Sequence, residues 1–333
     1  MATEQRTVVT TSSASGFFKT FLVILFVGIL LVLALICGGA AMVASTGSSM
    51  GSAYEEVLDA GTDSAKVLVV DVAGPIGMQS MMSLPGEDSI ERRISEAADA
   101  ASKGEIAGIL LSVDSPGGSV AVCDRAYYQL KQAVKDNPNL KIYAHFKGLA
   151  ASGGYYISCA AGRIFCEPTC ITGSIGVIME SYDMHSFLRW LGVSVEVYKS
   201  GEKKDMLSPF RAPTEDEKKQ VQSIIDEEYG RFVAIVEAAR GLSHEKVLAL
   251  ADGGIYSSKQ AFDLGLVDQI AYEDEVYKYV RNDLKKNVSF VAKRRKRGLL
   301  DLLGVKAEPS IEQRVEAMMK LDGTPVLLYM WKR

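Results

Sequence analysis

The sequence predicts an α/β protein built around a mostly parallel β-sheet. Short apolar segments at 66–72, 106–113 and 140–145 alternate with two segments, 89–103 and 119–135, whose apolar residues recur at helical spacing. Strands that alternate with helices are typical of βαβ units, and strands that are apolar on both sides are buried between layers of helices. The 333 residues are enough to enclose a sizeable core, in one large domain or two small ones.

The second half of the chain continues this alternation. A serine-containing segment at 152–161 is expected to be helical, and Thr214 with Glu217 has the pattern of a capping box that opens a long amphipathic helix at 214–240. Such a helix must cover an apolar surface of this subunit or of a neighbour. The other expected elements are short strands at 163–167, 175–179 and 193–198, helices at 183–190, 257–264 and 274–284, and a strand at 288–292.

The N-terminal region is different in kind. The apolar run at 21–43 has roughly 23 residues, which is long enough to cross a hydrocarbon core of ~30 Å and longer than the apolar part of a cleaved signal peptide. Arg6 and Lys19 precede it, so we expect a cytoplasmic N-terminus, a single pass through the cell (inner) membrane and an extracytoplasmic domain. Lipidation at Cys37 is disfavoured because the bulky Ile36 precedes it.

These features divide the chain into five parts. We expect a cytoplasmic tail at 1–20, a transmembrane signal-anchor at 21–44, a flexible linker at 45–65, the main folded domain at 66–285 and a C-terminal extension at 286–333. The extension holds a basic run at 293–297, either a solvated loop or a contact for anionic lipid headgroups. It ends in an apolar tail at 326–331, which we expect to dock on the fold or on a neighbour.

Composition excludes several classes of function. A net charge of −4 argues against general affinity for nucleic acid. Five cysteines and three histidines form no metal-ligand pattern, so neither a metal nor a cofactor is expected. The cysteines are interpreted as buried free thiols, although a disulfide stays open if the domain lies outside the cytoplasm.

The most informative segment is Ala150-Ala151-Ser152-Gly153-Gly154-Tyr155-Tyr156. A serine flanked only by small residues, between a strand and a helix, admits a carbonyl group, and the N–H groups at the start of the helix can stabilise an oxyanion. Ser115-Pro116-Gly117-Gly118-Ser119 closes the preceding strand. Two such loops facing one crevice would suit acyl transfer, although each motif alone also occurs in ordinary tight turns.

A serine nucleophile needs a base that removes its proton. Three histidines are available: His145, His185 and His244. The first lies inside an apolar strand and the others in surface-like sequence, but a Ser-His-Asp triad stays open because its members can be distant in the chain. The other candidate is a desolvated lysine. Spacing alone does not choose among Lys199, Lys203 and Lys204, and a charged cluster after a strand is ordinarily a solvated loop.

Several motifs in order resemble those of the signal peptide peptidase A family, over about residues 66–285. The motifs are Ser-Pro-Gly-Gly-Ser at 115–119, Ala-Ser-Gly-Gly-Tyr-Tyr at 151–156, Thr-Gly-Ser-Ile-Gly-Val at 172–177, Ser-Gly-Glu-Lys-Lys-Asp at 200–205 and Gln-Ala-Phe-Asp-Leu-Gly-Leu-Val-Asp at 260–268. The resemblance implies a membrane-bound serine peptidase with the Clp protease/crotonase-like fold of repeated ββα units. A single catalytic unit after one anchor resembles the short form of the family.

The resemblance also implies roles for individual residues. Ser152 matches the nucleophile, Lys204 the general base and Ser174 the serine that orients the lysine. The implied oxyanion donors are the N–H groups of Gly117, Gly118 and Gly153. Asp205 is expected to point away from Lys204, because a facing carboxylate would favour the protonated lysine.

The sequence therefore predicts a membrane-anchored serine endopeptidase with a Ser-Lys dyad, in which 66–285 is the peptidase domain. Its expected partners are apolar peptides, including released signal peptides, the membrane, and other copies of the chain in a ring-like homo-oligomer whose serine and lysine can come from neighbouring subunits. The alternatives are a crotonase-type acyl-CoA enzyme and a membrane scaffold with an idle dyad. A further hypothesis is that the apolar tail occupies the cleft of its own or a neighbouring subunit.

Overall fold

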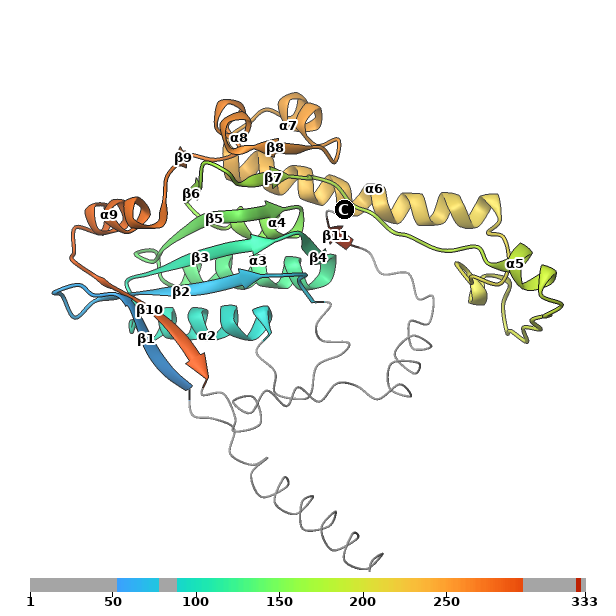
Figure 1. The fold of residues 1–333 in the computed structure, drawn as a ribbon, viewed down its shortest axis with the longest axis horizontal. Coiled ribbons are helices and arrows are strands. Elements are labelled where there is room, and N and C mark those ends of the chain that lie inside the picture. Colours follow the sequence, from blue (N-terminus) through green and yellow to red (C-terminus); the bar gives the residue numbers. More distant parts are fainter. Residues whose placement is uncertain (1–52, 78–88, 296–327, 331–333) are drawn as a thin grey trace, which may run out of the picture. The chain divides into compact units, whose positions relative to one another are not determined.

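The computed structural model describes residues 53–77, 89–295 and 328–330 (Figure 1). The expected transmembrane anchor lies outside these residues, as do the cytoplasmic tail and most of the C-terminal extension. Within the described ranges, no helix combines the length and the apolar character that a membrane crossing requires.

A mostly parallel sheet organises the described part of the chain. Its main path runs in the order β1 (Ala53–Asp59), β10 (Ser289–Arg295), β2 (Lys66–Ala73), β3 (Gly108–Ser115), β5 (Lys141–Ala151), β6 (Arg163–Cys166) and β9 (Gln269–Ile270). β2, β3 and β5 form the centre in parallel register, with Val69 opposite Leu110 and Leu110 opposite Tyr143. Beyond β5, β7 (Ile171–Gly173) pairs in parallel with β5 and antiparallel with β8 (Ile255–Ser257). The predicted α/β class with a mostly parallel sheet is confirmed.

Helices cover both faces of this sheet, because successive side chains of each strand point to opposite faces. Ile109, Leu111 and Val113 of β3 belong to a core shared with α2 (Ile90–Ser102) and α3 (Val120–Asp136). Leu110, between them, belongs to a second core with Phe165 and with α9 (Glu273–Leu284). The two cores hold the central strands between helices and fix where their carboxyl ends lie.

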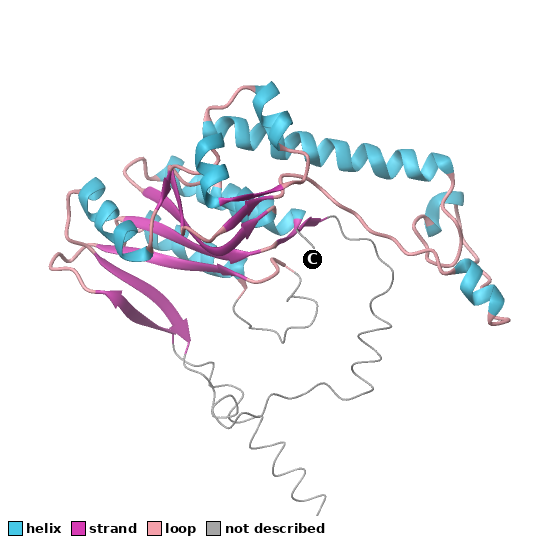
Figure 2. Ribbon diagram, turned by 45° about the horizontal axis from the view of Figure 1, so that its top comes forward, coloured by secondary structure: helices cyan, strands magenta, loops and turns pink. Residues whose placement is uncertain are grey.

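The long helix α6 (Glu215–Arg240) begins at the predicted capping box, in which the Thr214 hydroxyl accepts from Glu217 N–H and the Glu217 carboxylate accepts from Thr214 N–H. Its apolar residues become fully buried only in its second half, at Phe232, Val233 and Val236. That half packs on α4 (Gly153–Ser158) and α7 (His244–Leu250), and α8 (Ser258–Leu264) follows. The first half extends beyond the sheet, on the side of α5 (His185–Trp190) (Figures 1 and 2).

Two expected strands are wrong. The strand predicted at 175–179 lies instead at Ile171–Gly173, because the chain turns at Ser174, whose φ of 50° no extended strand adopts. The segment 193–198 has the alternation of a strand but forms none in the described chain. Val193, Val195 and Val197 are all exposed there, so the segment lacks the paired neighbour that a strand needs.

The expected domain limits also differ from the fold. Residues 53–59, expected as linker, form β1 beside β10. β10 itself lies in the main sheet, parallel to β2, so the folded domain continues past residue 285. Part of the basic run therefore has a structural place: Arg294 of β10 forms ion pairs with Glu56 at 2.8 Å and with Asp71 at 2.5 Å.

Candidate active site

Ser152 lies at the sharp turn between β5 and α4. Its backbone has φ 52° and ψ −112°, a positive-φ conformation that is strained for a residue with a side chain, and the residue is 1% exposed. Its N–H donates to the Gly173 carbonyl at 2.8 Å, and its carbonyl accepts from Tyr156 N–H at 2.8 Å. A strained serine between a strand and a helix is the geometry by which hydrolases present a nucleophilic hydroxyl.

Buried aromatic residues hold α4 in place behind this turn. The Tyr155 hydroxyl donates to the Leu266 carbonyl at 2.8 Å, and the Tyr156 hydroxyl donates to Asp124 Oδ1 at 2.7 Å. The Tyr156 ring also packs edge-on against Phe232 of α6, with ring centroids 4.9 Å apart. These contacts over-determine the position of α4, which is what a strained residue at its N-terminus requires.

Strand β7 brings Ser174 next to Ser152. Ala151 and Gly173 are register partners in the parallel β5–β7 pair, so the two serines are the next residues along neighbouring strands, which are about 4.8 Å apart. Ser174 has a φ of 50°, is 7% exposed and donates its N–H to the Gly254 carbonyl at 2.6 Å. It also borders a cavity of about 400 Å³. The other lining residues are Gly176, Val177, Ile178, Tyr229, Ala251, Asp252, Gly253 and Met330.

The glycine-rich strand β4 (Gly117–Ser119) lies against α4 on the other side of the serine. Ser115 is the register partner of Ala150, so Gly117 and Ser152 stand two residues beyond the same pair. Gly118 must be glycine, because a Cβ there would lie 2.0 Å from the Ile76 carbonyl oxygen. The Gly117 N–H already donates to Ser115 Oγ at 3.1 Å. Of the three predicted oxyanion donors, Gly117 is therefore already engaged by a side chain of its own loop.

The end of the chain pairs with this same strand. β11 (Leu328–Met330) runs antiparallel to β4, with Tyr329 opposite Gly118 and Met330 opposite Gly117. Met330 is half-buried and lines the cavity beside Ser174. The tail thus adds a strand to the predicted oxyanion loop of its own chain. This agrees with the form of the tail hypothesis in which the tail docks on its own subunit.

Lys204 lies apart from this cluster. It belongs to the 3-10 turn η2 (Glu202–Asp205), which has no buried residues and lies near α5, beyond the sheet. Its neighbour Lys203 pairs with Asp216 and donates to Gln220 Oε1 at 3.0 Å, whereas no carboxylate of the described residues lies within 4.0 Å of the Lys204 ammonium. The structure brings Ser152, Ser174 and the glycines together and leaves Lys204 on a separate, exposed surface.

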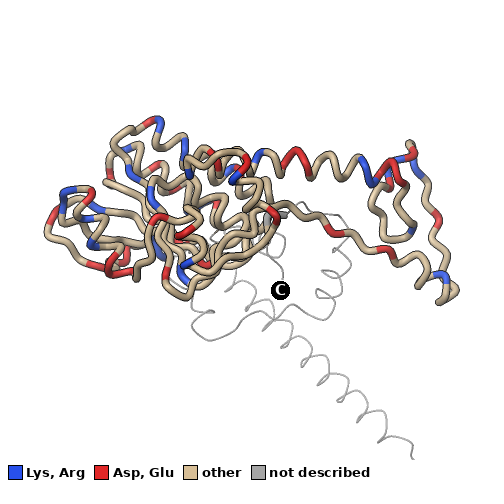
Figure 3. Tube along the Cα trace, turned by 90° about the horizontal axis from the view of Figure 1, so that it is seen from above, with Lys and Arg blue, Asp and Glu red and all other residues tan. Residues whose placement is uncertain are grey.

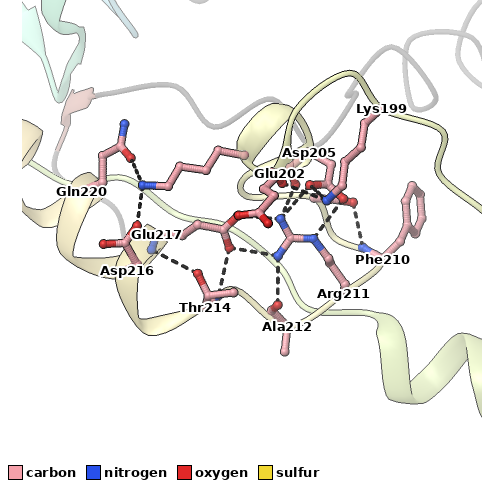
Figure 4. A network of polar contacts seen from close by, with 12 residues as sticks. Lys199, Glu202, Asp205, Phe210, Arg211, Ala212, Thr214, Asp216, Glu217 and Gln220 are labelled. Carbon is pink, nitrogen blue, oxygen red and sulfur yellow. Dashed lines mark hydrogen bonds and ion pairs between the residues drawn. The ribbon is translucent and has the colours of Figure 1, made fainter.

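The carboxylate beside Lys204 is turned to other partners, as expected. Asp205 accepts hydrogen bonds from Arg211 and Lys199 (Figure 4), which hold its pKa well below the ordinary range. This cluster belongs to the patch of mixed charge at the far end of α6 (Figure 3). The sequence did not single out Arg211, whose two carboxylate partners are six residues away on either side.

None of the histidines takes the place of the lysine. His145 lies on β5 seven residues before Ser152, or about 23 Å along an extended strand. It is buried, with its ring 3.8 Å from Glu167, and burial lowers its pKa. His185 contacts Arg189 within α5, and His244 at the start of α7 contacts Glu237 of α6.

The cysteines of the described chain are buried free thiols, as predicted. They are Cys123, Cys159, Cys166 and Cys170. Burial raises the pKa of Cys159 to about 12 and that of Cys166 to about 11, so both are held as neutral thiols. No group of three potential metal ligands occurs in the ranges that the structure describes.

Comparison with known proteins gives the family. Residues 135–288 match the model of peptidase family S49. The chain is 35% identical over 238 residues to a protein of Enterococcus faecium provisionally named signal peptide peptidase SppA, covering 69% of this chain and 67% of that protein. It is 41% identical over 167 residues to a protein of Synechocystis provisionally named a protease, covering 50% of this chain and 59% of that protein.

Among solved structures, the chain resembles a mutant of the 1510-N membrane-bound stomatin-specific protease in complex with a substrate peptide. The TM-score is 0.45 at 12% identity, over 78% of this chain and 98% of that one. ClpP1 from Listeria monocytogenes is matched with a TM-score of 0.36 at 17% identity, over 62% of this chain and 94% of that one. The family model and the Enterococcus relative together show that this chain belongs to peptidase family S49 and is a serine-type peptidase.

Proposed function

We propose that this peptidase is a membrane-anchored endopeptidase that hydrolyses apolar peptides, such as released signal peptides, through a Ser152–Lys204 dyad. The observation that carries the proposal is the strained turn at Ser152. Its hydroxyl is set at the carboxyl end of β5, between the start of α4 and the glycine strand β4, with Ser174 on the adjoining strand.

The proposed reaction uses three amino-acid side chains. Neutral Lys204 accepts the proton of the Ser152 hydroxyl while Ser152 Oγ attacks the peptide carbonyl carbon, and Ser174 hydrogen-bonds the lysine amine. The oxyanion accepts hydrogen bonds from Gly118 and Gly153 N–H. Lys204 then gives the proton to the leaving amine as the C–N bond breaks. Water, activated by the same lysine, hydrolyses the acyl-enzyme ester and restores the serine.

A lysine serves as a base at neutral pH when burial disfavours its charged form. Lys204 is exposed in the single chain, so we propose that a neighbouring copy in a homo-oligomeric ring buries it against Ser152 of the next subunit. Exposed apolar residues of α5 and of the segment 193–197, on the same side of the sheet as this turn, support this arrangement. They include Trp190, which is 79% exposed, and the alternating Val193, Val195 and Val197. Their burial against a second copy would supply the hydrophobic contact that such an assembly needs.

Peptide substrates are proposed to bind as an antiparallel strand on β4. The pairing of β11 with β4 supports this mode, because an extended segment of the chain already lies antiparallel along 117–119. β-strand addition fixes a peptide mainly through its backbone, and side-chain pockets then give the preference. The cavity at Ser174 contains Val177, Ile178 and Tyr229, which favours apolar side chains.

The location is proposed from the sequence. The apolar run at 21–43 and its flanking charges favour a single-pass anchor in the cell (inner) membrane with an extracytoplasmic peptidase domain. An anchored domain would meet apolar peptides as they leave the bilayer. Carbonate-washed membranes should retain the full chain, and protease added outside spheroplasts should cleave it; a chain that washes off or stays protected would contradict this part.

The central experiment measures hydrolysis of a fluorogenic signal-peptide sequence by the full chain in detergent. Ser152→Ala and Lys204→Ala should each lower kcat by about 10³-fold or more, because they remove the nucleophile or its base. Lys203→Ala is the matched control, since it removes the neighbouring ammonium only, and it should hydrolyse the peptide nearly as fast as the parent. Ser174→Ala should lower kcat with little change in KM.

Each variant is checked for assembly by its sedimentation coefficient. Activity that survives in an assembled Lys204→Ala protein would move the base to another residue. A parent chain that cleaves neither apolar nor polar peptides would refute the proposed endopeptidase.

A further inference from the structure

Arg211 is the centre of an ionic cluster that joins the Lys204 turn to the start of α6 (Figure 4). Its Nε and Nη2 donate to the two Asp205 carboxylate oxygens at 2.9 and 2.7 Å. Its Nη1 and Nη2 donate to the two Glu217 oxygens at 2.9 and 2.5 Å. One guanidinium therefore makes two bidentate pairs, the strongest geometry that an arginine offers a carboxylate.

The cluster is electrically neutral, and its two carboxylate side chains are largely buried. The Glu217 side chain is only 3% exposed and that of Asp205 only 11%. Lys199 supplies the second cation, with Nζ 2.7 Å from Asp205 Oδ1. Two carboxylates and two cations thus cancel, and hydrogen bonds from Arg211 lower the pKa of Glu217 to about 2 and that of Asp205 further still. Both carboxylates are therefore committed as anions at neutral pH.

Both sequence neighbours of Lys204 are held by partners other than Lys204. Lys203 pairs with Asp216 of α6, and Asp205 pairs with Arg211. The Lys204 backbone is fixed within the same turn, where its N–H donates to the Gly201 carbonyl at 3.1 Å. The charged groups around the turn are Lys199, Glu202 and Lys203 on its own loop, Arg211 after it, and Asp216 and Glu217 of α6.

We infer that Arg211 is a positioning residue for the proposed base Lys204: it withdraws the adjacent Asp205 carboxylate from the lysine and fixes the lysine turn on the N-terminus of α6. This inference rests on the proposed function, because it assumes that Lys204 acts as the base. Arg211 itself touches no reacting atom.

The chemical reason lies in what a free Asp205 would do. A carboxylate within about 4–6 Å of an ammonium favours the charged form, typically by one to three pH units. A base must be neutral to accept the serine proton, so an unrestrained Asp205 would move the rise of activity to higher pH. By engaging both Asp205 oxygens, Arg211 prevents this while it keeps the turn rigid.

The test is the pH–rate profile of kcat/KM for the full chain, measured for four proteins: the parent, Arg211→Met, Asp205→Asn and the double variant. Arg211→Met should move the acidic limb up by about one pH unit, which is about a tenfold loss of activity at a pH on that limb. Adding Asp205→Asn should return the limb to the parent position, because the released carboxylate is gone. A role in folding alone would lower activity equally at every pH and would show no such rescue.

Arg125→Met is the matched control. Arg125 of α3 pairs with a carboxylate, Glu91 of α2, through Nε and Nη2, and it is remote from the lysine turn. Its profile should keep the parent limb. If Arg211→Met does not assemble, Arg211→Lys replaces it. Lysine keeps the charge but cannot form both bidentate pairs, so a smaller shift in the same direction is expected.

The outcomes separate this inference from the proposed function. An inactive Lys204→Ala together with unshifted Arg211→Met and Arg211→Lys profiles would overturn the role of Arg211 and leave the dyad intact. An active Lys204→Ala would overturn the dyad, and with it the premise of this inference, whatever the arginine variants show. A shift that Asp205→Asn fails to reverse would also overturn the inference, because the carboxylate would not be its cause.

Discussion

Replacing Gly118 by alanine tests the geometry of the proposed oxyanion strand. The added Cβ would lie 2.0 Å from the Ile76 oxygen and 2.6 Å from its nitrogen, both backbone atoms that cannot swing aside. Ordinary contact begins near 3.4 Å, so β4 and Ile76 must separate by about 1.4 Å. Two hydrogen bonds span this gap, from Ile76 N–H to the Gly117 carbonyl at 2.8 Å and from Ser119 N–H to the Ile76 carbonyl at 2.9 Å.

The expected magnitudes follow from that displacement. Loss of the two hydrogen bonds costs about 2 kcal/mol of unfolding free energy, at about 1 kcal/mol each. Displacement of the Gly118 N–H should lower kcat by about 10²-fold or more, the usual effect of losing one oxyanion donor. Urea unfolding and hydrolysis of the fluorogenic peptide measure the two quantities on the same protein.

Gly230→Ala is the control for this substitution, since a Cβ at that position on α6 meets no atom within 4 Å. It should keep parental kcat and raise helix stability by up to about 1 kcal/mol. A Gly118→Ala protein that loses stability but keeps kcat would refute the oxyanion role of Gly118. One that loses neither would refute the close approach of β4 to Ile76.

Three further predictions concern the tail, α4 and the ionic cluster. Tyr329→Pro removes a backbone N–H from β11 and should weaken its pairing with β4. If the tail competes with peptide substrates for β4, their apparent KM should fall about fivefold or more at unchanged kcat. An unchanged KM would argue against competition. Tyr155→Phe, at a fully buried hydroxyl, should lower the unfolding free energy by about 1–2 kcal/mol in urea titration, and a parental value would show that the bond to Leu266 contributes nothing. The pKa of Glu217 falls from 4.5 to about 2 on folding, so its contribution to the stability of the folded cluster is complete above pH 4.5 and is lost as the pH falls toward 2. Hydrogen exchange of residues 199–217, corrected for its intrinsic pH dependence, should accelerate over that interval. Constant protection would contradict the cluster.

Local patterns in the sequence predicted much of the fold. The apolar runs that became β2, β3 and β5 are continuous because both sheet faces are covered, and Thr214 with Glu217 marks the start of α6 through a contact only three residues long. The turn at Ser152 could also be predicted from local sequence, because the small residues at 150–154 allow α4 to pack closely. A Cβ at Gly154 would lie 3.2 Å from the Ser115 carbonyl oxygen.

What the sequence did not predict depends on distant or absent partners. No local sequence pattern predicts that residues 328–330 pair with 117–119. None predicts that contact with Ile76 requires glycine at position 118. Arg211 binds carboxylates six residues away on both sides, a spacing that belongs to neither helix nor strand periodicity. The segment 193–198 has the alternation of a strand but forms none in the described chain, where Val193, Val195 and Val197 are exposed.

The separation of Ser152 from Lys204 has a genetic consequence. In a ring where each site takes its serine from one copy and its lysine from the next, two different inactive alleles should complement each other. Random mixing of Ser152→Ala and Lys204→Ala chains would leave about a quarter of the sites with both native side chains. Cells carrying either allele alone would lack the activity, and cells carrying both would regain part of it, without any recombination between the two genes.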